Sequence, residues 1–336
     1  MRRIYRTFLN PLARRTPKLP VILMYHRVAC LQYDPWGLAV DPERFDAQMH
    51  WLASERLVLP LHDFVDRLRA GNLPDNSAAI TFDDGYVDNF KNALPAIRRH
   101  GLCATVFVVG GAIGRSDGFW WDELAGLILE SRSKLDASVT IGNHTISLNW
   151  PTRADCPGPD PSWRAWQTPS QAREAAYVAA WQALRNASSE ARLEGMRGLR
   201  MLLPPVDMDR HRAMSICELH ELTTGAAFTL GGHTMSHSAL PALADDTLRK
   251  ELADSLAVCH GMSPSELIGF AYPYGDLDDR VYGEVRASGF AWACTTRSDF
   301  VDCRKFDLFA LPRLAIGDWQ PQQLAAFLQT DENRAN

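Results

Sequence analysis

The sequence predicts an α/β fold built on a parallel sheet. Short apolar runs rich in β-branched and aromatic residues alternate with segments whose apolar residues recur at helical spacing. Several of the apolar runs end in glycine or acidic residues, as strands do where they turn into loops. Because strands that alternate with helices assemble side by side in one direction, we expect a parallel sheet, either open or closed into a barrel.

The strands and helices are predicted in the following order. A β-rich run begins the fold at 21–26, and Phe45, Met49 and Leu52 mark the first helix at 45–55. The remaining strands are expected at 78–82, 104–109, 228–231, 268–272, 291–295 and 309–316. The remaining helices are expected at 90–100, 247–260, 281–288 and 321–328.

The alternation breaks between about 118 and 226. Two β-rich runs at 138–141 and 144–148 flank Gly142-Asn143, which predicts a hairpin. A proline-rich loop follows, and then a helix is predicted over 170–203 with Ser170 as its cap. We interpret this region as an insertion on one loop of a single domain that spans 21–330.

The composition excludes several classes of protein. Apolar residues make up 46% of the 336 residues and the formal net charge is −5, values that fit neither a disordered chain nor a broadly basic nucleic-acid binder. No run approaches the roughly 18 apolar residues of a membrane span. The seven cysteines form no CxxC pair, which favours free thiols in a reducing compartment.

The first 20 residues form a basic segment with six Lys and Arg and no acidic residue. Apolar residues alternate with the arginines at helical spacing, but no apolar region of a signal peptide is present. The segment is either an amphipathic helix that binds an anionic membrane surface peripherally or a solvated or locally packed helix. We therefore expect a cytoplasmic protein, with the membrane contact on the inner face.

Three clusters of polar or aromatic residues follow predicted strands, where α/β folds place their active sites. Asp83 and Asp84 are adjacent carboxylates that need a cation or a shared proton, although they could also begin a helix. His233 and His237 are spaced to lie on one face of a helical turn and so to reach one metal ion, although such a pair alone is a weak signal. The third cluster, at 270–275, is an aromatic strand end that turns at Gly275.

Together these clusters resemble the polysaccharide deacetylase family, which is carbohydrate esterase family four with its NodB homology domain. The chain carries TFDDGY at 81–86, HTMSH at 233–237 and YPYG at 272–275, and VILMYHRV at 21–28 is similar to the opening strand of many bacterial members. The resemblance covers roughly 20–115 and 226–320. It implies a distorted (β/α)7 barrel and a metal-dependent hydrolysis of acetyl groups on sugars.

The resemblance also implies roles for individual residues. Asp83 corresponds to the catalytic base, and the backbone N–H of Tyr274 corresponds to an oxyanion donor. Asp84, His233 and His237 correspond to the ligands of a divalent metal ion. We expect Zn²⁺, with Co²⁺, Ni²⁺, Mn²⁺ and Fe²⁺ as alternatives.

The chain departs from the family pattern twice. Ala271 stands where most members have an arginine, and the strand at 311–314 lacks the histidine that supplies the general acid. His26 could replace that acid, because the first and last strands of a closed barrel are neighbours. Arg313 could replace the arginine and pair with Asp83. The alternatives are a core histidine with its hydrogen bonds satisfied and a surface ion pair.

Aromatic residues are the candidates for substrate contact. Trp120 and Trp121 follow the strand at 104–109 closely enough to stack on a sugar, although they could equally pack in the core. Tyr86, Tyr272 and Pro273 belong to the motifs and are predicted to contact substrate as well.

The predicted function is removal of N-acetyl groups from amino sugars of a bacterial glycan or a lipid-linked precursor. An O-acetyl esterase or an N-deformylase could use the same site. A non-haem Fe(II) oxygenase also uses two histidines and a carboxylate, but it would leave Asp83 without a role. A non-catalytic glycan-binding descendant is a further alternative.

Overall fold

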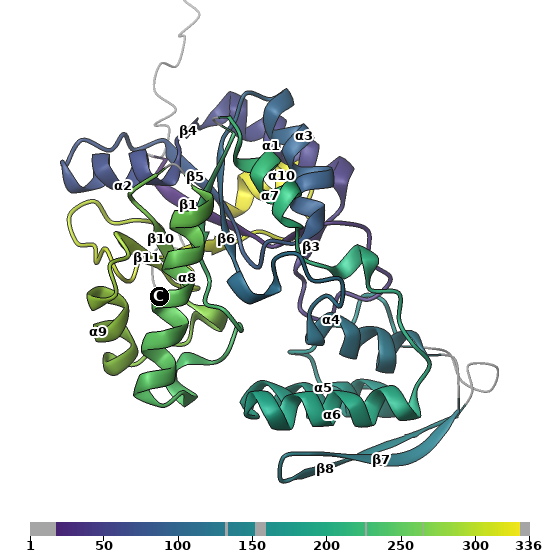
Figure 1. The fold of residues 1–336 in the computed structure, drawn as a ribbon. Coiled ribbons are helices and arrows are strands. Elements are labelled where there is room, and N and C mark those ends of the chain that lie inside the picture. The colour runs from purple at the N-terminus through teal and green to yellow at the C-terminus, as the bar shows by residue number, and fades with distance from the viewer. Residues whose placement is uncertain (1–17, 132–133, 152–158, 226, 264, 330–336) are drawn as a thin grey trace, which may run out of the picture.

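The computed structural model describes residues 18–131, 134–151, 159–225, 227–263 and 265–329. The predicted basic helix at the N-terminus lies almost wholly outside the described residues. A curled parallel sheet with the strand order β11-β10-β9-β6-β5-β1-β12 forms the centre of the molecule (Figure 1). Its strands are β1 Val21–Tyr25, β5 Ser77–Phe82, β6 Ala104–Val108, β9 Phe228–Gly232, β10 Gly269–Ala271, β11 Trp292–Cys294 and β12 Leu314–Ala315, and β4 Leu57–Val58 pairs with the start of β5.

A short segment bridges the two edges of the curled sheet. Leu311 forms a parallel bridge with Cys294 of β11, and Leu314 of β12 pairs with Leu23 of β1. Residues 311–314 therefore connect the last strand to the first and close a distorted barrel. The predicted (β/α)7 barrel is confirmed, and the first and last strands are neighbours as expected.

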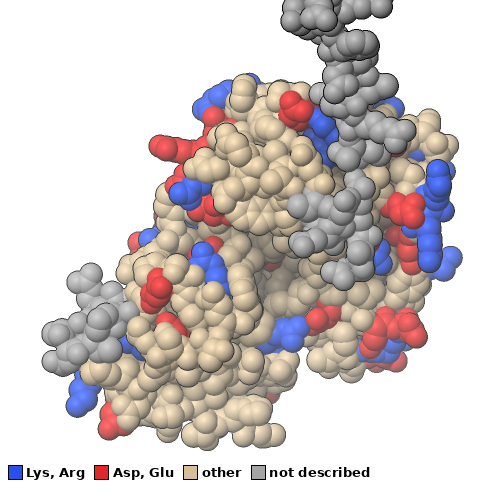
Figure 2. Space-filling view, turned by 180° about the vertical axis from the view of Figure 1, so that it is seen from behind, with Lys and Arg blue, Asp and Glu red and all other residues tan. Residues whose placement is uncertain are grey.

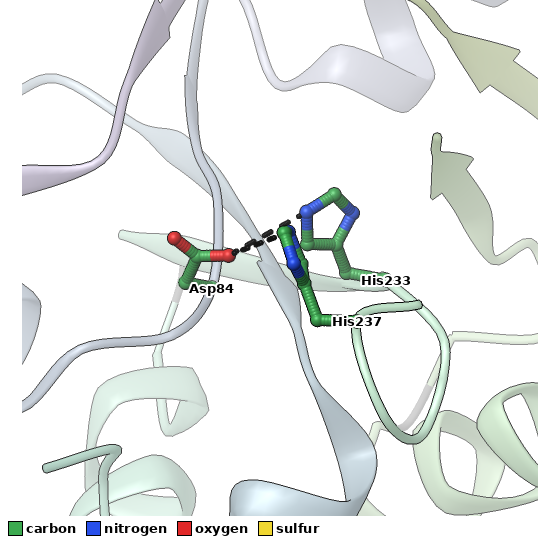
Figure 3. A group of neighbouring side chains, drawn as sticks. All are labelled: Asp84, His233 and His237. Atoms are coloured by element: carbon green, nitrogen blue, oxygen red, sulfur yellow. Dashed lines mark ion pairs between the residues drawn. The ribbon is translucent and has the colours of Figure 1, made fainter. Parts of the chain in front are cut away.

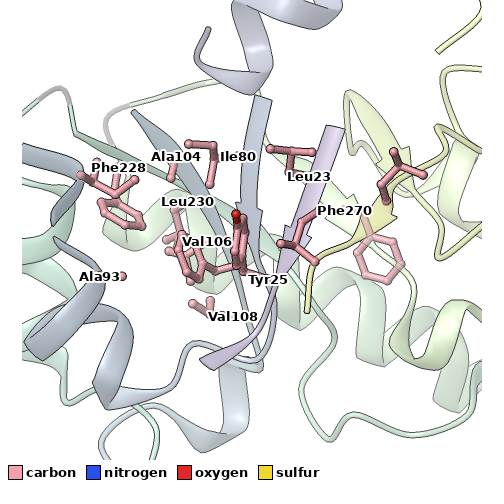
Figure 4. Close-up of a cluster of buried hydrophobic side chains, with 14 of the residues drawn as sticks. Leu23, Tyr25, Ile80, Ala93, Ala104, Val106, Val108, Phe228, Leu230 and Phe270 are labelled. Atoms are coloured by element: carbon pink, nitrogen blue, oxygen red, sulfur yellow. The ribbon is translucent and has the colours of Figure 1, made fainter. Parts of the chain in front are cut away.

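Alternate residues of the strands enter two different hydrophobic clusters. Leu23, Ile80 and Val106 join one cluster (Figure 4), whereas Ile22 and Phe107 join another. This period-two pattern follows from strand geometry, and it leaves both faces of the sheet apolar because helices or the opposite barrel wall cover each of them.

Helices connect the barrel strands. They are α1 Pro42–Glu55, α2 Leu61–Arg69, α3 Leu94–Arg99, α7 Ile216–Thr223, α8 Asp245–Met262, α9 Asp279–Ala287 and α10 Pro321–Phe327. Asp41 begins α1 by accepting the N–H groups of Glu43 and Arg44, and Asp278 begins α9 by accepting that of Val281. The short strands β2 Arg27–Val28 and β3 Ala39–Val40 pair beside the barrel. Within the described residues, no helix has the length and apolar character needed to cross a membrane.

The region between α4 and α7 packs to one side of the barrel (Figure 1). It contains α4 Trp120–Ala125, the hairpin β7 Leu135–Ile141 and β8 His144–Trp150, α5 Ala172–Asn186 and α6 Ser189–Leu202. Its side chains form a hydrophobic cluster of their own around Leu148 and Leu184. The predicted hairpin is present and longer than expected.

The single helix predicted over 170–203 is wrong, because the structure contains two helices. Ala187 is extended at the break, and Ser188 begins α6 by accepting the N–H of Ala191. Ser170 does not cap α5; its hydroxyl instead donates to the carboxylate of Glu174. Helical composition alone did not reveal this break, since Ser188 reads equally well inside a helix.

A buried arginine joins the barrel to this side region. Arg27 is 1% exposed and donates to Asp88 at 3.0 Å and to Asp122 of α4 at 2.9 Å. Its guanidinium also lies 4.3 Å from the ring centroid of Tyr86 and contacts His211 at 2.9 Å. Because Asp122 belongs to α4 and Arg27 to β2, this ion pair fixes α4 against β2, which directly follows β1.

On the face shown in Figure 2, acidic and basic side chains are interspersed around a central hollow. Exposed pairs such as Arg249 with Asp246 and Glu284 contribute little to stability, because water screens them.

We predict that Arg27→Met lowers the free energy of unfolding by about 3–5 kcal/mol, because it leaves buried carboxylates without a partner. Arg249→Met is the matched control: it also removes an arginine that pairs with carboxylates, but an exposed one, and should lower the free energy of unfolding far less because water screens such pairs. Urea denaturation followed by circular dichroism measures both. Equal losses in the two variants would contradict the role given to Arg27.

Candidate functional site

The carboxyl ends of the barrel strands converge on one cavity of about 420 Å³. Four of these strands contribute a group at the point where they end, as expected for a parallel barrel. The groups that line the cavity are His26 after β1, Asp83 and Asp84 after β5, His233 and His237 after β9, and Tyr274 after β10.

Asp84 and the two histidines form a compact group of possible metal ligands (Figure 3). Asp84 Oδ1 lies 3.3 Å from Nε2 of His237 and 3.6 Å from Nε2 of His233. The Nδ1 of His233 lies 2.7 Å from the carbonyl oxygen of Ala271, which can only accept, so Nδ1 carries the proton. The lone pair on Nε2 is therefore free to bind a metal, because a hydrogen bond from the other ring nitrogen of a histidine commonly fixes its tautomer in this way.

The electrostatics of this group fit a divalent cation. Asp84 Oδ1 is buried and has no hydrogen-bond partner among the described residues. Burial, together with the charges of Asp83 and Asp122, raises the pKa of Asp84 well above its usual value. Burial also lowers the pKa of His233 and that of His237, so both imidazoles are neutral at pH 7. A buried carboxylate without a partner is costly, and a cation held with two imidazoles satisfies it.

The loop that carries the two histidines is not the helical turn predicted from their spacing. Thr234 and His237 both have positive φ angles, 66° and 51°. The hydroxyl of Thr234 accepts the N–H of His237, and the carboxylate of Glu251 in α8 accepts the N–H groups of Met235 and Ser236. Both imidazoles reach one point because this loop curls, not because a helix spaces them.

Backbone strain is concentrated at this site. Of the described residues other than glycine, only Asp84, Thr234, His237 and Tyr274 have positive φ angles. Such a conformation costs roughly 1–3 kcal/mol per residue and is commonly retained for function. Gly275 has φ of 73°, and a Cβ there would lie 1.9 Å from Oγ1 of Thr296, so only glycine fits after Tyr274.

Asp83 forms the ion pair with Arg313 that the sequence predicted. Both carboxylate oxygens accept from the guanidinium at 2.7 Å, and the pair is buried rather than at the surface. Burial alone would raise the pKa of Asp83, but the charge of Arg313 and its hydrogen bonds to the carboxylate outweigh burial and hold that pKa below its usual range. Asp83 is therefore ionised throughout the physiological pH range.

His26 faces the cavity and is not a core histidine. Its Nε2 lies 3.9 Å from Oδ2 of Asp83. Burial lowers the pKa of His26 to about 4, with Asp83 acting in the opposite direction and Arg313 adding to the decrease. In this environment the imidazole is neutral at pH 7.

Tyr274 lies on the turn Pro273–Gly275, which follows β10. Its ring packs against that of His237 with centroids 4.5 Å apart, and burial raises the pKa of its hydroxyl. The left-handed conformation of Tyr274 turns the backbone beside the metal-ligand group, where the sequence predicted an oxyanion donor.

The two tryptophans predicted to contact substrate differ in whether they line the cavity. Trp121 lines the cavity, with its ring 4.6 Å from that of His237. Trp120 lines a neighbouring pocket of about 370 Å³ instead.

Tyr86, Tyr272 and Pro273 are buried, which does not fit the predicted substrate contact. The hydroxyl of Tyr86 accepts from Trp121 and donates to Asp122, both at 2.7 Å. The hydroxyl of Tyr272 donates to a backbone carbonyl at 2.9 Å. Both tyrosines therefore use their polar groups inside the protein.

Among the side chains that line the cavity and that sequence reasoning missed, the large aromatic and charged ones are Trp36, Trp181 and Arg185. Trp181 and Arg185 are four residues apart in α5, so they lie on one face of the helix. The spacing was readable in the sequence, but helical aromatic residues most often indicate core packing. Trp36 lies in a Pro-Trp-Gly loop that carried no pattern at all.

Known proteins resemble this chain in sequence over part of their length. A putative polysaccharide deacetylase of Bacillus subtilis, YxkH, is 29% identical over 131 residues, which cover 38% of this chain and 43% of that protein. A poly-β-1,6-N-acetyl-D-glucosamine N-deacetylase of Staphylococcus aureus is 30% identical over 80 residues, which cover 24% of this chain and 28% of that protein. The matches thus span less than half of these relatives.

Solved structures resemble the whole fold. The Streptococcus pyogenes deacetylase PplD, in complex with acetate, matches with a TM-score of 0.59 at 17% identity, over 94% of this chain and all of that one. IcaB from Ammonifex degensii matches with a TM-score of 0.55 at 17% identity, over 93% of this chain and 98% of that one. At such low identity these matches support the fold alone.

The family model described as polysaccharide deacetylase matches residues 70–189 and 218–293. The match runs into the segment 118–226, which the motifs had left outside the resemblance. Since the two matched ranges span more than half of the sequence, the chain belongs to the polysaccharide deacetylase family.

Proposed function

We propose that this protein is a metal-dependent hydrolase that removes N-acetyl groups from amino sugars of a bacterial glycan or a lipid-linked saccharide. The observation that carries the proposal is the buried carboxylate of Asp84, which lacks a hydrogen-bond partner at Oδ1 within the described residues and faces two neutral imidazoles. The acetylated glucosamine polymer named for the staphylococcal relative supports an N-acetylated glycan as the substrate.

Asp84, His233 and His237 would hold the metal ion. Two imidazoles and one carboxylate suit Zn²⁺, and the same donors accept Co²⁺, Ni²⁺, Mn²⁺ or Fe²⁺. When bound, such an ion polarises an acyl carbonyl and lowers the pKa of a water molecule.

Asp83 is suited to accept the proton of the attacking water, because its low pKa keeps it ionised. The bidentate contact with Arg313 fixes the orientation of the carboxylate, and one lone pair on each oxygen remains available. The backbone N–H of Tyr274 would stabilise the negative charge that develops on the acyl oxygen when water attacks the acyl carbon.

His26 is the candidate for protonating the leaving amine. Because its pKa in the free protein is about 4, it must gain its proton during the reaction rather than carry one beforehand. The nearest source is Asp83, which lies 3.9 Å away and has by then received the proton of the water. A small approach of the two side chains brings them within hydrogen-bond distance.

An O-acetyl esterase is the second candidate. The neutral state of His26 favours it, because an alkoxide leaves with less help from an acid than an amine does. Mass spectrometry of acetyl or formyl release from a panel of N-acetylated, O-acetylated and N-formylated amino sugars tests both functions. Release from N-acetylated sugars that stops on chelation supports the first; no release from any member of the panel contradicts both.

The metal ligands and the base should respond differently to substitution. We predict that Asp84→Ala or His233→Ala abolishes both metal binding and activity, because each removes a ligand. Asp83→Asn should keep the metal but lower kcat by roughly 10²–10⁴-fold, since an amide cannot accept the proton. Metal content by mass spectrometry and turnover are measured on the same samples.

The exposed histidine of the hairpin provides the control, and His144→Ala should change neither quantity. Full metal occupancy in Asp84→Ala would show that the ligands are wrongly assigned. Wild-type turnover in Asp83→Asn would remove Asp83 as the base.

His26→Ala should slow amide hydrolysis by roughly 10²–10⁴-fold, as expected for loss of a positioned acid. The same variant should lose much less activity on an activated phenyl ester, because that leaving group departs without protonation. Both rates are measured on folded, metal-loaded protein. An equal loss on the two substrates would argue against His26 as the acid.

The low pKa of His26 also predicts how stability depends on pH in the metal-free protein. The folded pKa of about 4 lies below the ordinary 6.5, so the unfolded chain binds the extra proton between these values. The free energy of unfolding therefore falls by about 1.4 kcal/mol per unit as pH drops below 6.5. From pH 7 to 5, wild type should lose about 2 kcal/mol more than His26→Gln.

Urea denaturation at the two pH values measures this difference. His144→Gln, which replaces an exposed histidine, should behave like wild type. Identical pH dependence in wild type and His26→Gln would show that the imidazole is not desolvated.

A further inference from the structure

Part of the cavity wall comes from outside the barrel strands. Trp36 lies in the loop before β3, and Trp181 and Arg185 lie in α5 of the side region, yet all three line the cavity that contains Asp84. None of them has a role in the hydrolysis described above.

The α5 contribution is a ridge of side chains spaced four residues apart. Tyr177, Trp181 and Arg185 occupy positions i, i+4 and i+8 and so lie along one face of the helix. Tyr177 is buried, and its hydroxyl accepts a hydrogen bond of 2.9 Å from the indole N–H of Trp36. The rings of Trp36 and Trp181 pack with centroids 4.2 Å apart. The two tryptophans therefore hold each other in place.

The other end of the ridge is fixed to the barrel. Arg185 forms an ion pair with Asp276, and its guanidinium lies 4.6 Å from the ring centroid of Tyr274. The rings of Trp181 and Tyr274 meet edge to face at 6.1 Å, and Tyr274 packs against His237. A continuous series of rings thus leads from the loop before β3 to a metal ligand.

The rings of Trp36 and Trp181, called the aromatic wall below, are held in place by their neighbours but are not fully buried. Trp36 and Trp181 are both half-buried, so part of each ring stays accessible beside the cavity. Tyr177 anchors the wall on one side and Asp276 on the other, which removes most of the cost of ordering it when a ligand binds. The cavity volume of about 420 Å³ lies in the usual range for small-ligand sites and leaves room beyond an acetyl group.

We propose that Trp36 and Trp181 form a subsite for a second sugar residue of the glycan, adjacent to the residue whose acyl group is hydrolysed. The apolar C–H face of a pyranose ring packs on an indole while its hydroxyl groups remain solvated, as aromatic side chains with a wet edge allow. The inference rests on the proposed function, because it takes the acylated glycan as the ligand. It makes Trp181 a specificity-determining residue for oligosaccharides over single sugars.

The competing explanation is that the two tryptophans only attach α5 to the barrel. In that case removing one would lower stability and affect every ligand alike. A subsite predicts a loss that depends on the length of the ligand, which a purely structural role does not produce.

The test compares a β-1,6-linked N-acetylglucosamine tetrasaccharide with the methyl glycoside of N-acetylglucosamine on the metal-loaded protein. Isothermal titration calorimetry gives the affinity, and acetate release gives kcat/KM. For Trp181→Ala, the loss in affinity and in kcat/KM should be about tenfold larger for the tetrasaccharide than for the single sugar. Trp181→Phe keeps a ring and should recover most of that difference.

Trp166→Ala is the matched control, because Trp166 is a 65% exposed indole of the same region that does not line the cavity. It should leave the affinity for the tetrasaccharide unchanged. Thermal melting of each variant shows that the folded fraction is comparable.

Two results would overturn the subsite. One is unchanged tetrasaccharide affinity in Trp181→Ala; the other is an equal loss on both ligands. Absence of tetrasaccharide binding by the wild type would overturn it as well. If the wild type binds the tetrasaccharide through Trp181 but releases no acetate, the proposed function fails and the subsite stands.

Discussion

The buried ion pair between Asp83 and Arg313 is the interaction on which both the barrel and its site depend. Arg313 lies in the segment that bridges β11 to β1, and it donates to the carbonyl of Thr295 as well as to both oxygens of Asp83. One side chain therefore connects the last strands of the barrel to the end of β5. Two charges taken out of water are tolerated only with such bidentate geometry, so closure of the barrel and the orientation of Asp83 are coupled.

The Asp83–Arg313 pair also explains why the arginine side chains near Asp84 do not neutralise its carboxylate. Arg313 compensates Asp83, and Arg27 is compensated by Asp88 and by Asp122, so neither of the two arginines whose charge acts on Asp84 is available to pair with it. The neutral imidazoles beside it carry no charge either. The remaining ways to stabilise a buried carboxylate are protonation or a bound cation, and the imidazole lone pair freed by the Ala271 carbonyl favours the cation.

Much of the fold could be read from the sequence, because alternating strand and helix patterns leave few arrangements of a parallel sheet. The motif residues were placed together correctly for the same reason: Asp83, Asp84 and His233 each follow a strand, and the ends of parallel strands meet. Contacts that depend on the direction in which a side chain points could not be predicted from the sequence. Tyr86 belongs to the TFDDGY motif and was predicted, like Trp121, to contact substrate, yet its side chain is buried and its hydroxyl donates to Asp122.

The local backbone conformation at two places could not be predicted from the sequence either. The spacing of His233 and His237 suits a helical turn, but the hydroxyl of Thr234 and the carboxylate of Glu251 stabilise a curled loop instead. The break between α5 and α6 likewise involves a side chain, because the hydroxyl of Ser188 accepts the N–H of Ala191 and so begins a second helix. In both places a side chain competes for a backbone donor, and tertiary contacts decide the outcome.

The strained residues and the side region complement each other in how they build the site. Asp84, Thr234, His237 and Tyr274 hold unfavourable backbone conformations, which persist only where surrounding contacts oppose relaxation. Part of that opposition comes from α5, since Arg185 lies against the ring of Tyr274 and binds Asp276 two residues later. The side region therefore contacts the turn at Tyr274 directly and is not merely attached to the outside of the barrel. Because of this contact, the same helix that borders the cavity also helps to maintain the geometry at its centre.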